Sequence, residues 1–165
     1  MGAVEVAEQV AEEVIRSQYE IERGKPMPSK NHSRLQQRIG VELANHYGDK
    51  FDTYSELSLE APNPPTVPDL CLFPAEASNW RVDEVKVSEV PLTVIEIVSP
   101  SQTDTELTAK SVAYFAAGVK SYWLVQPVLR TVFVLLPDGN ELVFHNDTLT
   151  DPTNGISIDL RKVFR

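Results

Sequence analysis

The feature that most constrains the fold is a short apolar stretch at 92–98, which lies between Pro91 and Pro100 and carries one carboxylate, Glu96. Aliphatic residues on both sides of the alternation predict a strand in the interior of a sheet. A carboxylate enclosed there loses hydration, at a cost of several kcal/mol, unless a cation, a partner or a ligand offsets the loss. We therefore expect a partner at Glu96. On an edge strand, Glu96 would instead be a solvated charge that opposes aggregation.

The order of the predicted elements indicates the fold class. Helical periodicity occurs at 4–19, at about 33–47 and at 104–117, and strand patterns occur at 51–59, 67–73, 121–125, 131–136 and 141–145. This order predicts an α/β (α+β) fold, with a mixed central sheet flanked by helices, N-terminal helices and a C-terminal hairpin. The strand at 92–98, the helix at 104–117 and the strand at 121–125 form a right-handed crossover that joins parallel strands. The length of 165 residues predicts one domain spanning 1–165.

The charge balance restricts the class of partner. The chain has 24 acidic and 15 basic residues and a formal net charge of −9, which excludes a general nucleic-acid coat protein. The segment 23–41 nevertheless contains no Asp or Glu, and two of its arginines stand four residues apart on one helical face. We predict that this basic patch contacts the nucleic-acid backbone through Lys30, His32, Arg34 and Arg38.

The sequence also bears on localisation and on cysteine chemistry. No apolar run approaches the roughly 18 residues of a membrane span, and acids stand where a signal peptide needs positive charge. A cytoplasmic protein without a membrane partner is predicted. The single Cys71 excludes an internal disulfide and is expected to pack as a small apolar side chain.

Three polar residues that follow or interrupt the apolar elements are candidates for catalysis. Asp69 lies at one predicted strand, Glu96 in the next long one, and Lys110 on the helix that follows. If the strands are neighbours, the two carboxylates converge and offer the hard oxygen ligands that suit Mg²⁺ or Mn²⁺. A nearby lysine orients the attacking water or stabilises charge on phosphorus. This combination is typical of a phosphodiesterase.

The order and spacing of these residues resemble the Uma-type family of restriction endonucleases, in the PD-(D/E)XK nuclease superfamily. The resemblance covers about 19–164. The residues that carry it are Glu20, Gly24, 26–29, His32, Val67-Pro68-Asp69-Leu70, 94–101, Lys110 and 118–125. It implies a restriction-endonuclease-like core with a metal site at the open edge of the sheet, and DNA as the substrate.

The resemblance also assigns roles to individual residues. Asp69 becomes the aspartate of the "PD" motif and Glu96 the second acid, with the main-chain carbonyl of Ile97 as a further metal ligand. The superfamily lysine normally stands two residues after the acid, where this chain has Val98, so its role passes to Lys110. Glu20 is expected to support the metal through water.

One departure from the family pattern concerns the end of the strand at 121–125. Gln126 follows this strand, where the family usually has an acid. The role of that acid is therefore not carried over to this chain.

Each of these residues also has a purely structural interpretation. Pro68-Asp69 is a common turn dipeptide, Lys110 a typical solvated helix residue, and Glu20 a typical hairpin surface charge. His46 and His145 lack metal-ligand spacing and are expected to be structural or on the surface.

Two functions from different classes follow. The first is a Mg²⁺- or Mn²⁺-dependent endonuclease that hydrolyses DNA phosphodiester bonds, with Asp69, Glu96 and Lys110 as catalytic residues. A homodimer is expected if it cuts both strands of a duplex. The alternative is a non-catalytic module on the same fold that binds nucleic acid or protein. Stabilisation by the metal ion distinguishes the first from the second.

Overall fold

The computed structural model describes residues 25–100 and 102–165. The predicted helix at 4–19 and the predicted ligand Glu20 lie outside the described residues. Among the described residues, no helix is long and apolar enough to cross a membrane.

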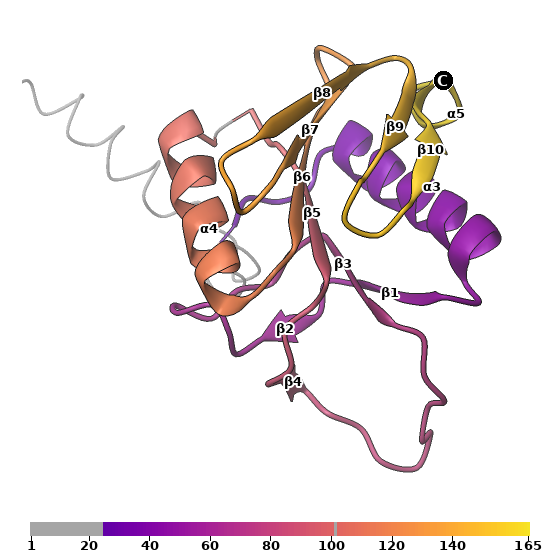
Figure 1. Cartoon of the computed structure of the whole chain (residues 1–165), viewed down its shortest axis with the longest axis vertical. Helices are drawn as coiled ribbons and strands as arrows, with labels where there is room; N and C mark the ends of the chain where they lie inside the picture. Colours follow the sequence, from indigo (N-terminus) through magenta and orange to yellow (C-terminus); the bar gives the residue numbers. More distant parts are fainter. Residues whose placement is uncertain (1–24, 101) are drawn as a thin grey trace, which may run out of the picture.

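A six-stranded mixed sheet forms the centre of the fold, in the order β1-β3-β5-β6-β7-β8 (Figure 1). Its strands are β1 (Phe51–Ser55), β3 (Leu70–Pro74), β5 (Thr93–Ile97), β6 (Ser121–Gln126), β7 (Thr131–Leu135) and β8 (Glu141–His145). Within this sheet of the described residues only β5 and β6 pair in parallel, and the helix α4 (Asp104–Ala117) connects them. The predicted α/β fold and the predicted crossover are confirmed. Because β5 lies between β3 and β6, the edge-strand interpretation of Glu96 is excluded.

Two predicted strands have different bounds in the structure. The pattern at 51–59 is divided into β1 and the short β2 (Ser58–Leu59), because Glu56 between them has a φ of 58° and turns the chain. The pattern at 67–73 becomes a strand only at Leu70, so Asp69 precedes β3. The segment 75–90 contains one strand, β4 (Lys86–Val87), which pairs with β2 in parallel.

Helices α3 (Lys30–Tyr47) and α4 cover opposite faces of the sheet (Figure 1). Ser29 begins α3 as its N-cap, since its Oγ accepts the N–H of His32 at 3.1 Å. The helix then buries Leu35, Ile39 and Leu43, as its periodicity predicts. Helix α4 begins after the N-cap Thr103 and ends at Gly118, whose φ of 109° is in the left-handed region that favours glycine.

The alternation of side chains along the sheet decides which helix each residue faces. Ile95 and Ile97 pack in the core cluster on the α3 side, and Val94 packs with Tyr114 and Tyr122 on the α4 side. Glu96 alternates with the isoleucines and therefore points to α4. Cys71 is fully buried in the same α4-side cluster, and burial raises the pKa of its thiol to about 12.

The last segment packs onto the α3 side of the sheet. It consists of β9 (Thr148–Thr150), β10 (Ser157–Asp159) and α5 (Leu160–Val163), of which β9 was not predicted from the sequence. A fully buried carboxylate, Asp151, fixes the loop between β9 and β10. Its Oδ2 accepts the Nε1–H of Trp123 at 2.7 Å and the hydroxyl of Ser121, and its Oδ1 accepts the N–H of Thr153 at 2.9 Å.

Candidate active site

Asp69 and Glu96 lie side by side at the ends of neighbouring strands. Leu70 of β3 pairs with Ile95 of β5, so the antiparallel register extended by one residue places Asp69 opposite Glu96. Both side chains are buried, with exposed fractions of 3% and 4%. The structure thus brings together the two carboxylates that the sequence analysis singled out.

The two carboxylates line one small cavity of about 20 Å³. The same cavity is lined by the predicted site residues Lys110, His32 and Ile97. A cavity of this kind needs roughly 10–15 Å³ to hold one water molecule. It therefore has room for a single water or ion between the polar groups.

The carboxylate of Asp69 is held by three donors from different parts of the chain. Oδ1 accepts from the Nζ of Lys25 at 2.7 Å, and Oδ2 accepts from the main-chain N–H of Ile97 at 2.8 Å and lies 3.0 Å from Nε2 of His32. Burial raises the pKa of this carboxyl, but the hydrogen bond from His32 and the positive charge of Lys25 outweigh burial and lower it from 3.8 to about 2. Asp69 is therefore a fixed, ionised carboxylate at neutral pH.

The carboxylate of Glu96 has the partners that its burial requires. Lys110 Nζ donates to Oε1 and Oε2 at 3.3 and 3.2 Å, Tyr122 donates to Oε2 at 2.7 Å, and Tyr114 donates to Oε1 at 3.3 Å. Burial and then the charge of Glu96 raise the pKa of both tyrosines, so both hydroxyls stay protonated and donate. This confirms the expectation that a buried Glu96 has a partner.

A further layer of contacts holds Lys25 in place. Its Nζ also donates to the carbonyl of Val67 at 2.9 Å and lies 3.5 Å from Oε2 of Glu56. Gln36 of α3 connects this group to the site, since its Nε2 donates to the carbonyl of Asp69 at 3.2 Å and to Oε1 of Glu56 at 3.3 Å. Helix α3, the Glu56 turn and the start of β3 are thereby fixed to one another around Asp69.

The donor set fits a hard divalent cation. In the part of the chain that the structure describes, no cluster of three or more His, Cys, Asp or Glu side chains is arranged to hold a metal. Mg²⁺, however, is commonly bound by only one or two carboxylates, with water and substrate phosphate completing its coordination. Nδ1 of His32 is buried without a hydrogen-bond partner among the described residues, so one polar atom of His32 is still able to form a hydrogen bond. The residues present fit a hard divalent cation better than a softer metal.

The predicted nucleic-acid contacts do not share one surface. Lys30 and Arg34 are exposed at the start of α3, and their phosphate contacts remain a prediction. Arg38 instead donates from Nη1 to the carbonyls of Val163 and Arg165 at the C-terminus. His32 is buried and points to Asp69, so it belongs to the carboxylate cavity and not to the exposed face of the helix.

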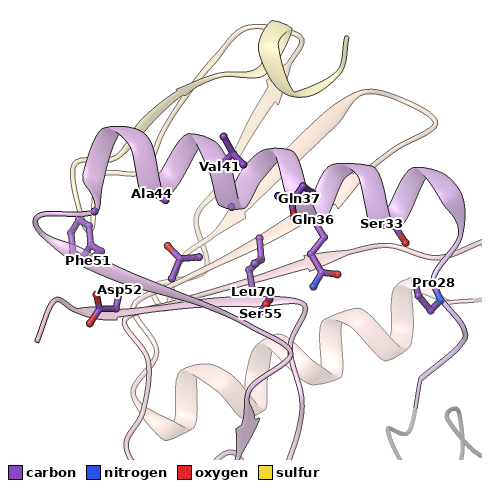
Figure 2. A pocket seen from close by; sticks show the side chains of 13 residues that line it. Pro28, Ser33, Gln36, Gln37, Val41, Ala44, Phe51, Asp52, Ser55 and Leu70 are labelled. Atoms are coloured by element: carbon purple, nitrogen blue, oxygen red, sulfur yellow. The ribbon is translucent and has the colours of Figure 1, made fainter. Parts of the chain in front are cut away.

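A larger groove of about 720 Å³ lies between α3 and β1 (Figure 2). Gln36, Gln37 and Val41 line it from the helix, and Asp52 and Ser55 line it from the strand. Among the described residues, no lysine or arginine lines this groove, and neither Asp69 nor Glu96 does. The charged residues of the candidate site therefore meet in the small carboxylate cavity and not in this larger groove.

Three residues of the site were missed in the sequence analysis. Tyr114 stands four residues after Lys110, and this helical spacing was a usable signal that both side chains share one face. Tyr122 pairs with Val94, two positions from Glu96 on the same face of the sheet, so only the strand register places it. Lys25 lies 44 residues before Asp69 in the sequence, and no local pattern joins the two.

The hydroxyl of Tyr122 gives a prediction about stability. Tyr122→Phe leaves Glu96 buried with one donor fewer, and the unmet acceptor is expected to lower the free energy of unfolding by about 1–3 kcal/mol. Urea unfolding followed by circular dichroism measures the change. Tyr54→Phe is the control, because its ring packs against Phe73 on the same sheet, and it is expected to change stability by less than about 0.5 kcal/mol. Equal stability of Tyr122→Phe and wild type would contradict this role.

Comparison with known proteins places the chain in a family. A search of curated proteins finds no match to the chain. A crystal structure from Anabaena variabilis ATCC 29413, described as "a putative nuclease belonging to DUF820", is similar with a TM-score of 0.71 and 23% identity, covering 84% of this chain and 83% of that one. That likeness shows a shared fold. Residues 9–161 match the family described as "Uma2: Putative restriction endonuclease", and the chain therefore belongs to the Uma2 family.

Proposed function

We propose that this protein is a metal-dependent endonuclease that hydrolyses DNA phosphodiester bonds. The observation that carries the proposal is the pairing of Asp69 and Glu96 in one cavity with Lys110. The family description and the fold shared with the Anabaena protein, itself described as a "putative nuclease", support the same reaction class. Mg²⁺ or Mn²⁺ is the proposed cofactor, because both carboxylates offer hard oxygen ligands.

Each residue of the site has a distinct proposed role. Asp69 and Glu96 would hold the cation, with the main-chain carbonyl of Ile97 as a further ligand and Glu20 acting through water. The cation, when bound, supplies a Lewis acid for the scissile phosphate. Lys110, whose Nζ lies 3.2 Å from Glu96, orients the attacking water or stabilises the charge that develops on phosphorus.

Other residues of the site keep the two acids in position. Tyr114 and Tyr122 fix both oxygens of Glu96, and His32 and Lys25 fix both oxygens of Asp69. Lys25 and Lys110 also balance the charge of the two buried carboxylates in the protein without metal. These contacts restrict the acids to one geometry before the cation arrives, which is the condition for a preorganised site.

Nicking of supercoiled plasmid tests the proposed reaction. The purified protein is incubated with Mg²⁺ or Mn²⁺, beside a sample with EDTA, and open-circular DNA is quantified on a gel. We expect nicking with metal and none with EDTA. A thermal-shift titration in parallel is expected to show stabilisation at millimolar metal, since ligands that bind only the folded state raise its stability. No nicking together with no metal stabilisation would overturn the proposal in favour of a non-catalytic module.

A further inference from the structure

A second cavity, of about 350 Å³, adjoins the carboxylate cavity. Lys25 and Lys110 line both, so the two lysine side chains stand where the cavities meet. Much of the remaining wall comes from the segment that carries Pro62, Pro64 and Pro65 and from α4, which contributes Ala109, Ala113 and Tyr114. A ligand that contacts a lysine from the second cavity therefore places the rest of its atoms inside that cavity.

The proline wall is held in a defined position. The loop at 60–65 is closed by two main-chain hydrogen bonds, from the N–H of Leu59 to the carbonyl of Thr66 at 2.9 Å and from the N–H of Thr66 to the carbonyl of Leu59 at 3.2 Å. The hydroxyls of Thr66 and Tyr114 lie 3.2 Å apart and connect the loop to α4. A wall that is already ordered loses little conformational entropy when a ligand binds.

The two lysines of this cavity differ in the donors that they have left. Among the described residues the cavity is lined by two lysines and by no Asp or Glu, but the ammonium of Lys25 already has Asp69 Oδ1 at 2.7 Å, the carbonyl of Val67 at 2.9 Å and Glu56 Oε2 at 3.5 Å as partners. The side chain of Lys110 is 33% exposed, and its ammonium has three N–H donors, of which the carboxylate of Glu96 engages two. The remaining donor of Lys110 is therefore available to an anion that is joined to a flat, apolar group.

We propose that this cavity takes one unpaired nucleotide of single-stranded DNA, with its phosphate toward Lys110 and its base against the prolines. The inference rests on the proposed nuclease function and names its substrate class. A volume of about 350 Å³ lies in the range of small-molecule pockets, roughly 300–1,000 Å³. A base that remains stacked in a duplex does not reach an enclosed pocket, whereas an unpaired base enters it without breaking a pair. Contact of the base face with apolar side chains is tolerant of sequence.

Filling the cavity provides the test. Ala113→Leu places a larger side chain in the wall, and Ala116→Leu is the matched control, because Ala116 is exposed on the same helix and does not line the cavity. The probe is a fluorescein-labelled oligothymidylate 12-mer, with fluorescence anisotropy measured in EDTA so that no cleavage occurs. A 12-mer of abasic residues and the same strand annealed to its complement serve as comparison ligands.

We expect wild type and Ala116→Leu to bind the 12-mer equally, and Ala113→Leu to bind it about tenfold more weakly. The abasic strand and the duplex are also expected to bind wild type about tenfold more weakly, because neither presents an unpaired base. Equal binding of all three ligands, or unchanged binding by a folded Ala113→Leu, would overturn the inference. Thermal unfolding verifies the fold, and Ala109→Leu, which alters the same wall at an exposed position, replaces Ala113→Leu if that variant does not fold.

The readout separates this inference from the proposed reaction. Single-strand binding that depends on Ala113, without metal stabilisation and without cleavage of plasmid or of the labelled 12-mer in Mg²⁺ or Mn²⁺, would support the pocket and refute hydrolysis. Plasmid nicking by a protein whose Ala113→Leu variant binds and cleaves as wild type does would support hydrolysis and refute the pocket.

Discussion

Glu96→Gln is expected to lower the rate of metal-dependent plasmid nicking by at least about a hundredfold. Glutamine keeps the size of the side chain and an oxygen that accepts from Tyr122, but it removes the negative charge that a hard cation needs. Loss of one electrostatic contact at a catalytic centre commonly reduces the rate by about 10²–10³. Initial rates of nicking at saturating Mg²⁺ and Mn²⁺ measure the effect, and the thermal shift caused by metal is expected to shrink in parallel.

The control for this variant is Glu89→Gln, which makes the same chemical change at an exposed position outside the carboxylate cavity. It is expected to nick at the wild-type rate. Circular dichroism and thermal unfolding verify that both variants fold. A folded Glu96→Gln protein that nicks plasmid as fast as wild type would remove Glu96 from the mechanism, and with it the proposed site.

Asp151→Ala is expected to cause the largest loss of stability, about 3–5 kcal/mol in the free energy of unfolding. The substitution leaves the Nε1–H of Trp123 and the N–H of Thr153 without their acceptor in the interior. Each unpaired buried donor costs about 1–3 kcal/mol, and the cavity left by the carboxylate adds to that loss. Because domains of this kind are stable by only about 5–15 kcal/mol, the change is a large part of the total.

Urea unfolding at neutral pH measures this loss, with unchanged m-values as the sign that both proteins unfold between the same states. Asp138→Ala is the control, because Asp138 is exposed in the β7–β8 turn and accepts from Asn140 at 2.8 Å. It is expected to change stability by less than about 1 kcal/mol. A similarly small loss for Asp151→Ala would show that Asp151 does not hold the loop between β9 and β10 to the sheet.

Local patterns were sufficient for the elements that carry Glu96 and Lys110. The apolar run at 92–98 predicted a buried strand, and Gly118 marked the end of α4, because burial and a left-handed φ restrict the residue type at the position itself. The same reasoning predicted a partner for Glu96, since an isolated buried carboxylate is too unfavourable to persist.

Patterns failed where a turn or a short pairing decided the bounds. The strand expected at 51–59 is broken at Glu56, and β9 was not found because its three residues pair with β10 across an intervening loop. Neither feature leaves a periodicity long enough to recognise. The basic face of α3 shows the same limit, since His32 turns inward to Asp69 and Arg38 binds the C-terminal carbonyls.

The sequence by itself determined the mixed α/β order, the buried strand around Glu96 and the candidate trio Asp69, Glu96 and Lys110, because each depends on residue type and spacing along one element. Only the tertiary structure decided that Lys25 neutralises Asp69, that Tyr122 donates to Glu96, and that Lys25 and Lys110 stand between two cavities. These contacts join segments that are far apart in the chain. They follow from strand register and helix placement, which arise from packing of the whole core and leave no local signature in the sequence.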